Sequence, residues 1–227
     1  GTSFYWNYGT VFWQVDSQNM IRGGKIIIYN PTRKRTKYIN WIHSIQIKQG
    51  EITDFNLNQC FFGEHLLTQN NKTIAIVESE KTACTMSLLF NKYLWLVAGS
   101  LNGINKSKME VLKNKKIILY PDLGIIGKNG SPFTIWESKC HYLKKLGFDI
   151  EISDLLELNG TEKDRENGYD IADYFLQSIN QAPKIILSNQ QKLVDKLYLK
   201  NKNLKILIEL FGLTDLSGNA ITVSLKE

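Results

Sequence analysis

The chain has 227 residues, of which 43% are hydrophobic and 22% are charged, and it carries a formal net charge of +6. This composition is that of an ordinary globular protein, with enough residues for one large domain or two modest ones. No apolar run approaches the roughly 18 residues that cross a bilayer, so the sequence does not predict a membrane protein. The excess of lysine and arginine favours a polyanionic partner such as nucleic acid.

The three cysteines, Cys60, Cys84 and Cys140, show no paired spacing. An odd count without a disulfide framework is typical of reduced thiols, so we expect a cytoplasmic protein. The sequence contains no CxxC pair and its histidines are scattered, so it does not favour a zinc site.

The N-terminal part of the chain has the pattern of a small β-sheet. The predicted strands are residues 11–15, 25–29 and 38–42. Aromatic residues are dense here, namely Phe4, Tyr5, Trp6, Tyr8, Phe12, Trp13, Tyr38 and Trp41. Such rings stack on bases in single-strand binders, or they fill the core of a small sheet, and we favour the core for most of them. With a linker and short helix expected at 56–68, this part forms an N-terminal subdomain over residues 1–70.

Basic residues gather in three clusters, at 33–37, 106–116 and 192–205. Each cluster alone is typical of a solvated surface, whereas the three together favour a nucleic-acid surface. The side chains that we expect to contact nucleic acid are Arg33, Lys34, Arg35, Lys37, Lys106 and Lys108.

From residue 71 onward, apolar strand-like runs alternate with helical patterns. The predicted strands are 74–77, 94–98, 117–120 and 148–152, and the predicted helices are 80–91, a basic helix that ends near 112, and 133–145. Alternation of this kind indicates βαβ units and a parallel sheet covered by helices on both faces. We therefore expect an α/β domain over residues 71–188, with a last strand at 185–187. Helical patterns at 190–199 and 204–211 predict a C-terminal helical tail over 189–227.

Two of the predicted parallel strands end in acid. Glu78 follows the strand at 74–77, and Asp122 follows the strand at 117–120. The carboxyl ends of parallel strands are where open α/β sheets bind their ligands. Mg²⁺ takes oxygen ligands and usually only one or two carboxylates together with phosphate, so the pattern predicts a divalent cation site. The alternative is that an acid at a helix start, such as Glu80, is a capping residue, and that Asp122 belongs to a simple turn.

The residues around these acids resemble the motifs of a known family. The segment Val77-Glu78-Ser79-Glu80-Lys81-Thr82-Ala83 is similar to the first motif of Toprim domains, where a strand ends in Val-Glu-Gly-Glu-Lys or a close variant. The loop at 99–103 is similar to the loop of small residues after the second Toprim strand. Tyr120-Pro121-Asp122-Leu123-Gly124 stands where the family carries Asp-x-Asp, and Asp170-Ile171-Ala172-Asp173-Tyr174 resembles a later segment of primase-type members.

The resemblance covers about residues 72–187. With the strand-turn-strand at 11–29, the whole chain resembles a primase-like core of the type found on mobile elements of Bacteroidetes. The resemblance implies a Toprim-like fold that binds Mg²⁺ or Mn²⁺ weakly and acts on single-stranded DNA with nucleoside triphosphates. It also implies partners such as a helicase or other replication proteins, and no membrane.

Carried over by position, the resemblance gives roles to four residues. Glu78 would be a metal ligand and general acid or base, and Asp122 a metal ligand. Asp170 would be an accessory metal ligand, and Lys81 would meet a phosphate, so that Glu78, Lys81 and Asp122 form the catalytic set.

One position departs from the family pattern, because Gly124 stands where the second aspartate of Asp-x-Asp is expected. Two functions are therefore open. The first is Mg²⁺-dependent nucleotidyl transfer that makes RNA primers on single-stranded DNA during replication or transfer of a mobile element. The second is a non-catalytic Toprim module that binds DNA with a degenerate metal site. A Toprim nuclease is a further alternative.

Overall fold

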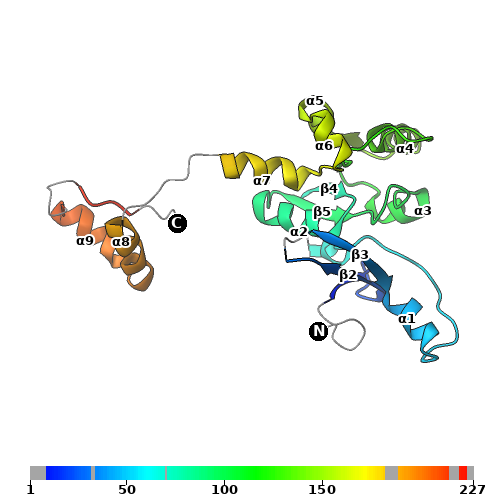
Figure 1. Ribbon diagram of the computed structural model, residues 1–227, viewed down its shortest axis with the longest axis horizontal. Coiled ribbons are helices and arrows are strands. Elements are labelled where there is room, and N and C mark those ends of the chain that lie inside the picture. The colour runs from blue at the N-terminus through cyan, green and yellow to red at the C-terminus, as the bar shows by residue number, and fades with distance from the viewer. Residues whose placement is uncertain (1–8, 32–33, 70, 182–188, 215–219, 224–227) are drawn as a thin grey trace. The chain divides into compact units, whose positions relative to one another are not determined.

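The computed structural model describes residues 9–31, 34–69, 71–181, 189–214 and 220–223, and the side chains of 178–192 are outside this description (Figure 1). The chain divides into two compact units, Gly1–Gln177 and Ser178–Glu227. Within the described residues, no helix is long and apolar enough to cross a membrane.

The first unit begins with a three-stranded antiparallel sheet in the order β1-β2-β3. Its strands are β1 (Thr10–Val15), β2 (Ile21–Tyr29) and β3 (Arg35–Trp41). The three predicted strands are confirmed, but β2 and β3 begin before the expected residues 25 and 38, and the chain turns into helix α1 (Ile42–Lys48) where the third strand was expected to end. α1 contributes Ile42 and Ile45 to the core of this sheet, because its apolar residues recur at helical spacing.

The interpretation that aromatic rings fill this core was wrong for Trp13 and Tyr38, whereas Phe12 and Trp41 are half-buried. The core consists of Ile26, Ile42 and Ile45, whose branched side chains occupy the space between sheet and helix. Trp13 and Tyr38 are instead 43% and 53% exposed. The Trp13 ring lies across Gly24, where an added Cβ would lie 2.8 Å from it. Phe4, Tyr5, Trp6 and Tyr8 lie outside the described residues.

The rest of the first unit is built on a four-stranded parallel sheet, which confirms the α/β prediction. Its strands are β4 (Thr73–Val77), β5 (Tyr93–Val97), β6 (Ile117–Leu119) and β7 (Ile150–Ile152), in the order β5-β4-β6-β7. β4 pairs in parallel with β5 on one side and with β6 on the other. The ends of β4 and β6 therefore lie next to each other.

Helices cover both faces of this sheet, as the continuous apolar strands predict. The helices are η1 (Glu64–Gln69), α2 (Glu80–Leu89), α3 (Lys106–Met109), η2 (Glu110–Leu112), α4 (Pro132–Lys145), α5 (Leu155–Asn159), α6 (Glu162–Glu166) and α7 (Ile171–Gln181). Ile74 and Ile76 of β4 pack into a core with Trp136 of α4. Ala75 and Val77, which alternate with them, pack into a second core with Met86 of α2.

The second unit contains α8 (Asn189–Lys200) and α9 (Asn203–Phe211), which confirms the two predicted C-terminal helices. α9 ends at Gly212, whose φ of +54° is the left-handed conformation typical of a helix C-terminus. The strand predicted at 185–187 lies outside the described residues.

Candidate functional site

Glu78 and Asp122 meet in one pocket of the first unit. Glu78 directly follows β4, Asp122 follows β6 by three residues, and these two strands are neighbours. The pocket has a volume of about 360 Å³ and is lined by Lys25, Arg35, Glu78, Ser79, Gly99, Ser100, Leu101, Asn102 and Asp122. Residues 99–102, from the loop that resembles the small-residue loop of Toprim domains, form one wall of it.

Each carboxyl group of this acidic pair has an oxygen that lacks a hydrogen-bond partner among the described residues. Oε1 of Glu78 and Oδ1 of Asp122 are buried and have no hydrogen-bond partner among the residues that the structure describes. Burial raises the pKa of Glu78 to about 7, although a backbone hydrogen bond from Asp122 and the charge of Lys139 oppose the shift. Burial, followed by the charges of Glu78, Asp170 and Asp173, raises the pKa of Asp122 well above its usual range. A cation would relieve both effects, because it supplies the missing partner and favours the charged forms.

Three cationic side chains surround the pair. Arg35 reaches the pocket from β3 and lowers the pKa of Asp122. Lys25 reaches it from β2, where it is paired with the buried Glu80. Lys139 of α4 lowers the pKa of Glu78, and its Nζ donates to the backbone oxygen of Leu101 at 2.5 Å. The pocket therefore combines two carboxylates with a basic surround.

Sequence reasoning named Arg35 for nucleic-acid contact only and missed Lys25 and Lys139. Lys25 carried a signal, because a lysine at the start of the apolar run Ile26-Ile27-Ile28 is hard to bury without a carboxylate partner. Lys139 lies on a helix among other charged residues, and nothing in its local sequence sets it apart.

Asp170 lies near the pair but is already hydrogen-bonded. Its Oδ2 accepts from Thr82 Oγ1 at 2.5 Å, and its Oδ1 accepts from the backbone N–H of Asp173 at 2.9 Å. The first bond ties the start of α7 to α2, and the second caps α7. Asp170 does not line the pocket, although its charge raises the pKa of Asp122. The contacts seen give Asp170 a positioning role beside the pair.

Lys81 was expected in the catalytic set and Gly124 stands where the family carries an aspartate, and the structure bears on both positions. Lys81 is exposed on the first turn of α2 and is not among the residues that line the pocket. A Cβ added at Gly124 would lie 2.8 and 2.9 Å from the ring of Pro132 at the start of α4. Any side chain at 124, including an aspartate, is therefore excluded unless Pro132 moves.

The residues present fit a cation that takes some of its ligands from water or phosphate. Over the described ranges, no three His, Cys, Asp or Glu side chains converge into a ready metal cage. Mg²⁺ commonly binds through one or two carboxylates and takes its remaining ligands from water and phosphate. The pair with its orphaned oxygens meets that requirement, and the cations beside it suit a phosphate.

Some of the side chains expected to contact nucleic acid are exposed, and one of them turns into the protein. Lys34, Lys37 and Lys106 are exposed, and Arg33 lies outside the described residues. Lys108 instead turns inward, where its Nζ donates to the backbone oxygen of Ala98 at 3.0 Å and lies 4.6 Å from the centre of the Phe61 ring. Only part of the predicted basic surface is therefore available on the outside.

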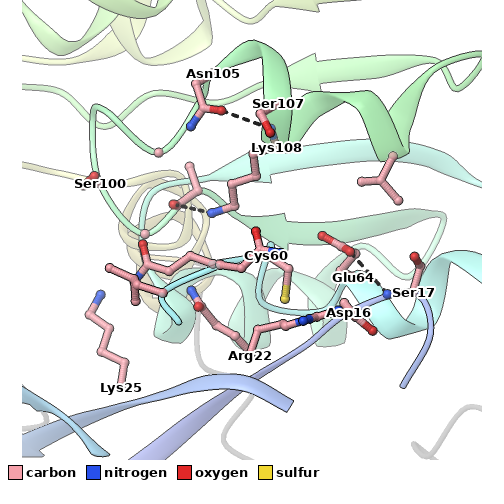
Figure 2. A pocket seen from close by; sticks show the side chains of 18 of the residues that line it. Asp16, Ser17, Arg22, Lys25, Cys60, Glu64, Ser100, Asn105, Ser107 and Lys108 are labelled. Atoms are coloured by element: carbon pink, nitrogen blue, oxygen red, sulfur yellow. Dashed lines mark hydrogen bonds and ion pairs between the residues drawn. The ribbon is translucent and has the colours of Figure 1, made fainter. Parts of the chain in front are cut away.

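Lys108 lines a second and larger pocket, of about 840 Å³, between the N-terminal sheet and the loop after β5 (Figure 2). This pocket shares Lys25, Gly99, Ser100 and Asn102 with the pocket of the acidic pair. The two pockets are therefore neighbours along the same loop.

Fold and site together define an α/β protein whose parallel sheet carries a buried carboxylate pair at the carboxyl ends of adjacent strands. Residues 1–123 match the family described as Domain of unknown function (DUF6371). The match covers more than half of the chain, and the protein belongs to this family. The matched residues include the N-terminal sheet, β4 to β6 and both acids of the pair, but not Asp170. No curated protein matches the chain.

Proposed function

We propose that this protein is a primase-like Toprim nucleotidyltransferase, which makes RNA primers on single-stranded DNA in the replication or transfer of a mobile element. The observation that carries the proposal is the Glu78–Asp122 pair, whose buried oxygens lack hydrogen-bond partners at the edge where parallel sheets bind ligands. Glu78 and Asp122 would hold Mg²⁺ or Mn²⁺. When bound, such a metal neutralises charge on phosphoryl oxygens and aligns them for in-line displacement.

The chain's own cations suit the triphosphate. Arg35 lines the pocket with the carboxylates, and a guanidinium binds phosphate oxygens in pairs. Lys139 lies close enough to Glu78 to lower its pKa, and its Nζ donates to the backbone oxygen of Leu101 in the loop 99–103. These groups would orient the phosphates against the pair, and the exposed Lys81 would meet phosphate at the rim.

The template would run along β3 in this proposal. Lys34 and Lys37 are exposed on and beside that strand, and Lys37 Nζ lies 5.6 Å from the centre of the Tyr38 ring. An exposed ring beside lysines is the arrangement on which single-stranded bases stack while the phosphates are neutralised. Lys106 would extend the basic surface on the side of α3.

Titration with Mg²⁺ by calorimetry, with and without nucleoside triphosphate, tests the metal site. The wild type is compared with Glu78→Gln and Asp122→Asn, and with Glu166→Gln as a control, because Glu166 is an exposed acid on α6. We expect binding that strengthens with triphosphate and disappears in the first two variants alone. Primer synthesis on single-stranded DNA is then measured with the same proteins. Absence of metal binding under both conditions would rule out the catalytic proposal.

A second function is favoured by the contact at Gly124. Because Pro132 occupies the space of a side chain there, the site holds one acid fewer than the Toprim pattern. A DNA-binding Toprim module without catalysis would tolerate this loss. It predicts DNA binding that is unchanged in Glu78→Gln and no primer product from any of the proteins. Cleavage of DNA with Mg²⁺ and no triphosphate would instead indicate a nuclease.

A further inference from the structure

The larger pocket has the size and lining of a site for a small polar molecule. Its volume of about 840 Å³ is within the range of pockets that hold nucleotide-sized ligands. Most of its wall is polar, with hydroxyl and amide side chains from the N-terminal sheet, the segment before η1 and the loop after β5. Those side chains include Gln14, Asn58, Gln59, Ser100, Asn102 and Asn105. An apolar ligand would leave these groups unpaired.

Three cations line the pocket, and two of them have their own acids. Arg22 Nε lies 2.5 Å from Oδ2 of Asp16, and Lys25 is paired with Glu80. The remaining acid of the pocket, Glu64, accepts from the backbone N–H groups of Ser17 and Phe61. Asp16 therefore has its own cation, whereas Glu64 is held by backbone N–H groups and acts on Lys108 only through its charge.

Lys108 is the cation left over. It forms no ion pair with a carboxylate among the described residues, and its Nζ donates to the backbone oxygen of Ala98. Figure 2 shows its side chain entering the pocket from α3, while Lys25 and Arg22 approach from β2. An ammonium group has three N–H donors, and the described residues offer it one carbonyl acceptor and the face of the Phe61 ring, which leaves a donor for a ligand. Burial lowers the pKa of Lys108 to about 8, and the nearby groups Cys60, Glu64 and Glu80 only partly oppose this shift.

Gln14 supplies an independent sign of a missing partner. Its side chain is 3% exposed and lines the pocket, yet its Oε1 is buried with no hydrogen-bond partner among the described residues. A buried amide oxygen without a partner costs free energy that a ligand donor would recover. Amide side chains both donate and accept, which is the capacity that the edge of a nucleobase requires.

We propose that this pocket binds a nucleoside phosphate without a metal ion, with the phosphate on Lys108 and the base against the amide groups around Gln14. The ligand is either a free mononucleotide or the 5′-phosphorylated end of a strand, which share this chemistry. The inference goes beyond the proposed function, because it requires neither Glu78 nor Asp122.

Calorimetry in EDTA tests the site, with the four nucleoside monophosphates, adenosine, and short oligonucleotides that carry a 5′-phosphate or a 5′-hydroxyl. The variants are Lys108→Met and Gln14→Leu, with Lys145→Met as the control, since Lys145 is exposed on α4 and lines neither pocket. We expect Lys108→Met to weaken phosphate-dependent binding about tenfold or more, and Lys145→Met to change it by less than about twofold. Gln14→Leu should weaken binding of the preferred nucleoside monophosphate, and should leave binding of inorganic phosphate, titrated in the same way, unaffected.

Each outcome decides the proposal. Binding of a mononucleotide that depends on Lys108 supports it, and Lys108-dependent binding of the 5′-phosphorylated oligonucleotide alone supports it with a strand end as the ligand. Absence of both kinds of binding overturns it. Equal weakening by Lys145→Met also overturns it, in favour of general electrostatic attraction to the surface. Thermal unfolding of Lys108→Met checks that the fold is intact. Glu78→Gln should bind the nucleotide in EDTA as the wild type does. Failure of primer synthesis would therefore count against the proposed function and not against this pocket.

Discussion

Lys25 Nζ lies 3.1 Å from both carboxylate oxygens of Glu80, and this ion pair joins the N-terminal sheet to the first turn of α2. The side chains of Lys25 and Glu80 are only 9% and 2% exposed. The pair explains why Glu80 is no substitute for the missing aspartate of the acidic site, since both of its oxygens are bound to Lys25. It also fixes the distance between the sheet that carries Arg35 and the strand that carries Glu78.

Removing either partner should destabilise the protein strongly. Lys25→Met leaves the Glu80 charge buried alone, and Glu80→Gln leaves that of Lys25, so each change should cost about 3 kcal/mol of the free energy of unfolding. The double variant leaves no buried charge and should recover much of the loss. Urea denaturation of the four proteins measures the coupling, and simple addition of the two single effects would contradict the pairing.

The raised pKa of Glu78 predicts a dependence of stability on pH. Because the folded protein holds this proton up to about pH 7 and the unfolded chain only to about 4.5, stability is full below the lower value and falls as the pH rises to the higher one. Glu78→Gln removes this loss and should stabilise the metal-free protein at about pH 8 by on the order of 2 kcal/mol. Denaturation at about pH 5 and about pH 8 measures the difference, and Glu166→Gln should show none.

The same shift predicts that binding of Mg²⁺ releases protons. A carboxyl group must lose its proton to bind a metal, and Glu78 is largely protonated below its pKa of about 7. The affinity for Mg²⁺ should therefore rise between about pH 6 and about pH 8, and the heat of binding should vary with the ionisation enthalpy of the buffer. An affinity that is constant over this range would show that Glu78 is not a ligand.

A side chain at position 124 should strain the start of α4. In Gly124→Ala the new Cβ would meet Pro132 Cγ at 2.8 Å, which we expect to cost about 1–3 kcal/mol of stability. Pro132→Ala removes the ring and should relieve the strain in the double variant. Thermal unfolding of the single and double variants measures this, and an equal loss in both would point to another cause.

The sequence alone determined the order of strands and helices over most of the described chain. The spacing of apolar residues, which distinguishes a strand from a helix, can be read from each short segment by itself. The sequence also placed Glu78 and Asp122 in one site, since parallel strands in succession end at the same edge of a sheet. Gly124 was visible as a departure from the pattern, but Pro132, which fills its space, comes from the next helix.

The tertiary structure decided the rest of the site. Lys25 and Arg35 come from a separate sheet, more than forty residues before Glu78, and only the packing of that sheet brings them to the pocket. Lys106 and Lys108 look alike in the sequence, yet one is exposed and the other enters a pocket, because a short helix turns neighbouring side chains in different directions. Strand ends follow from local pattern, whereas the partner of a buried charge depends on contacts between distant segments, and no local pattern encodes those.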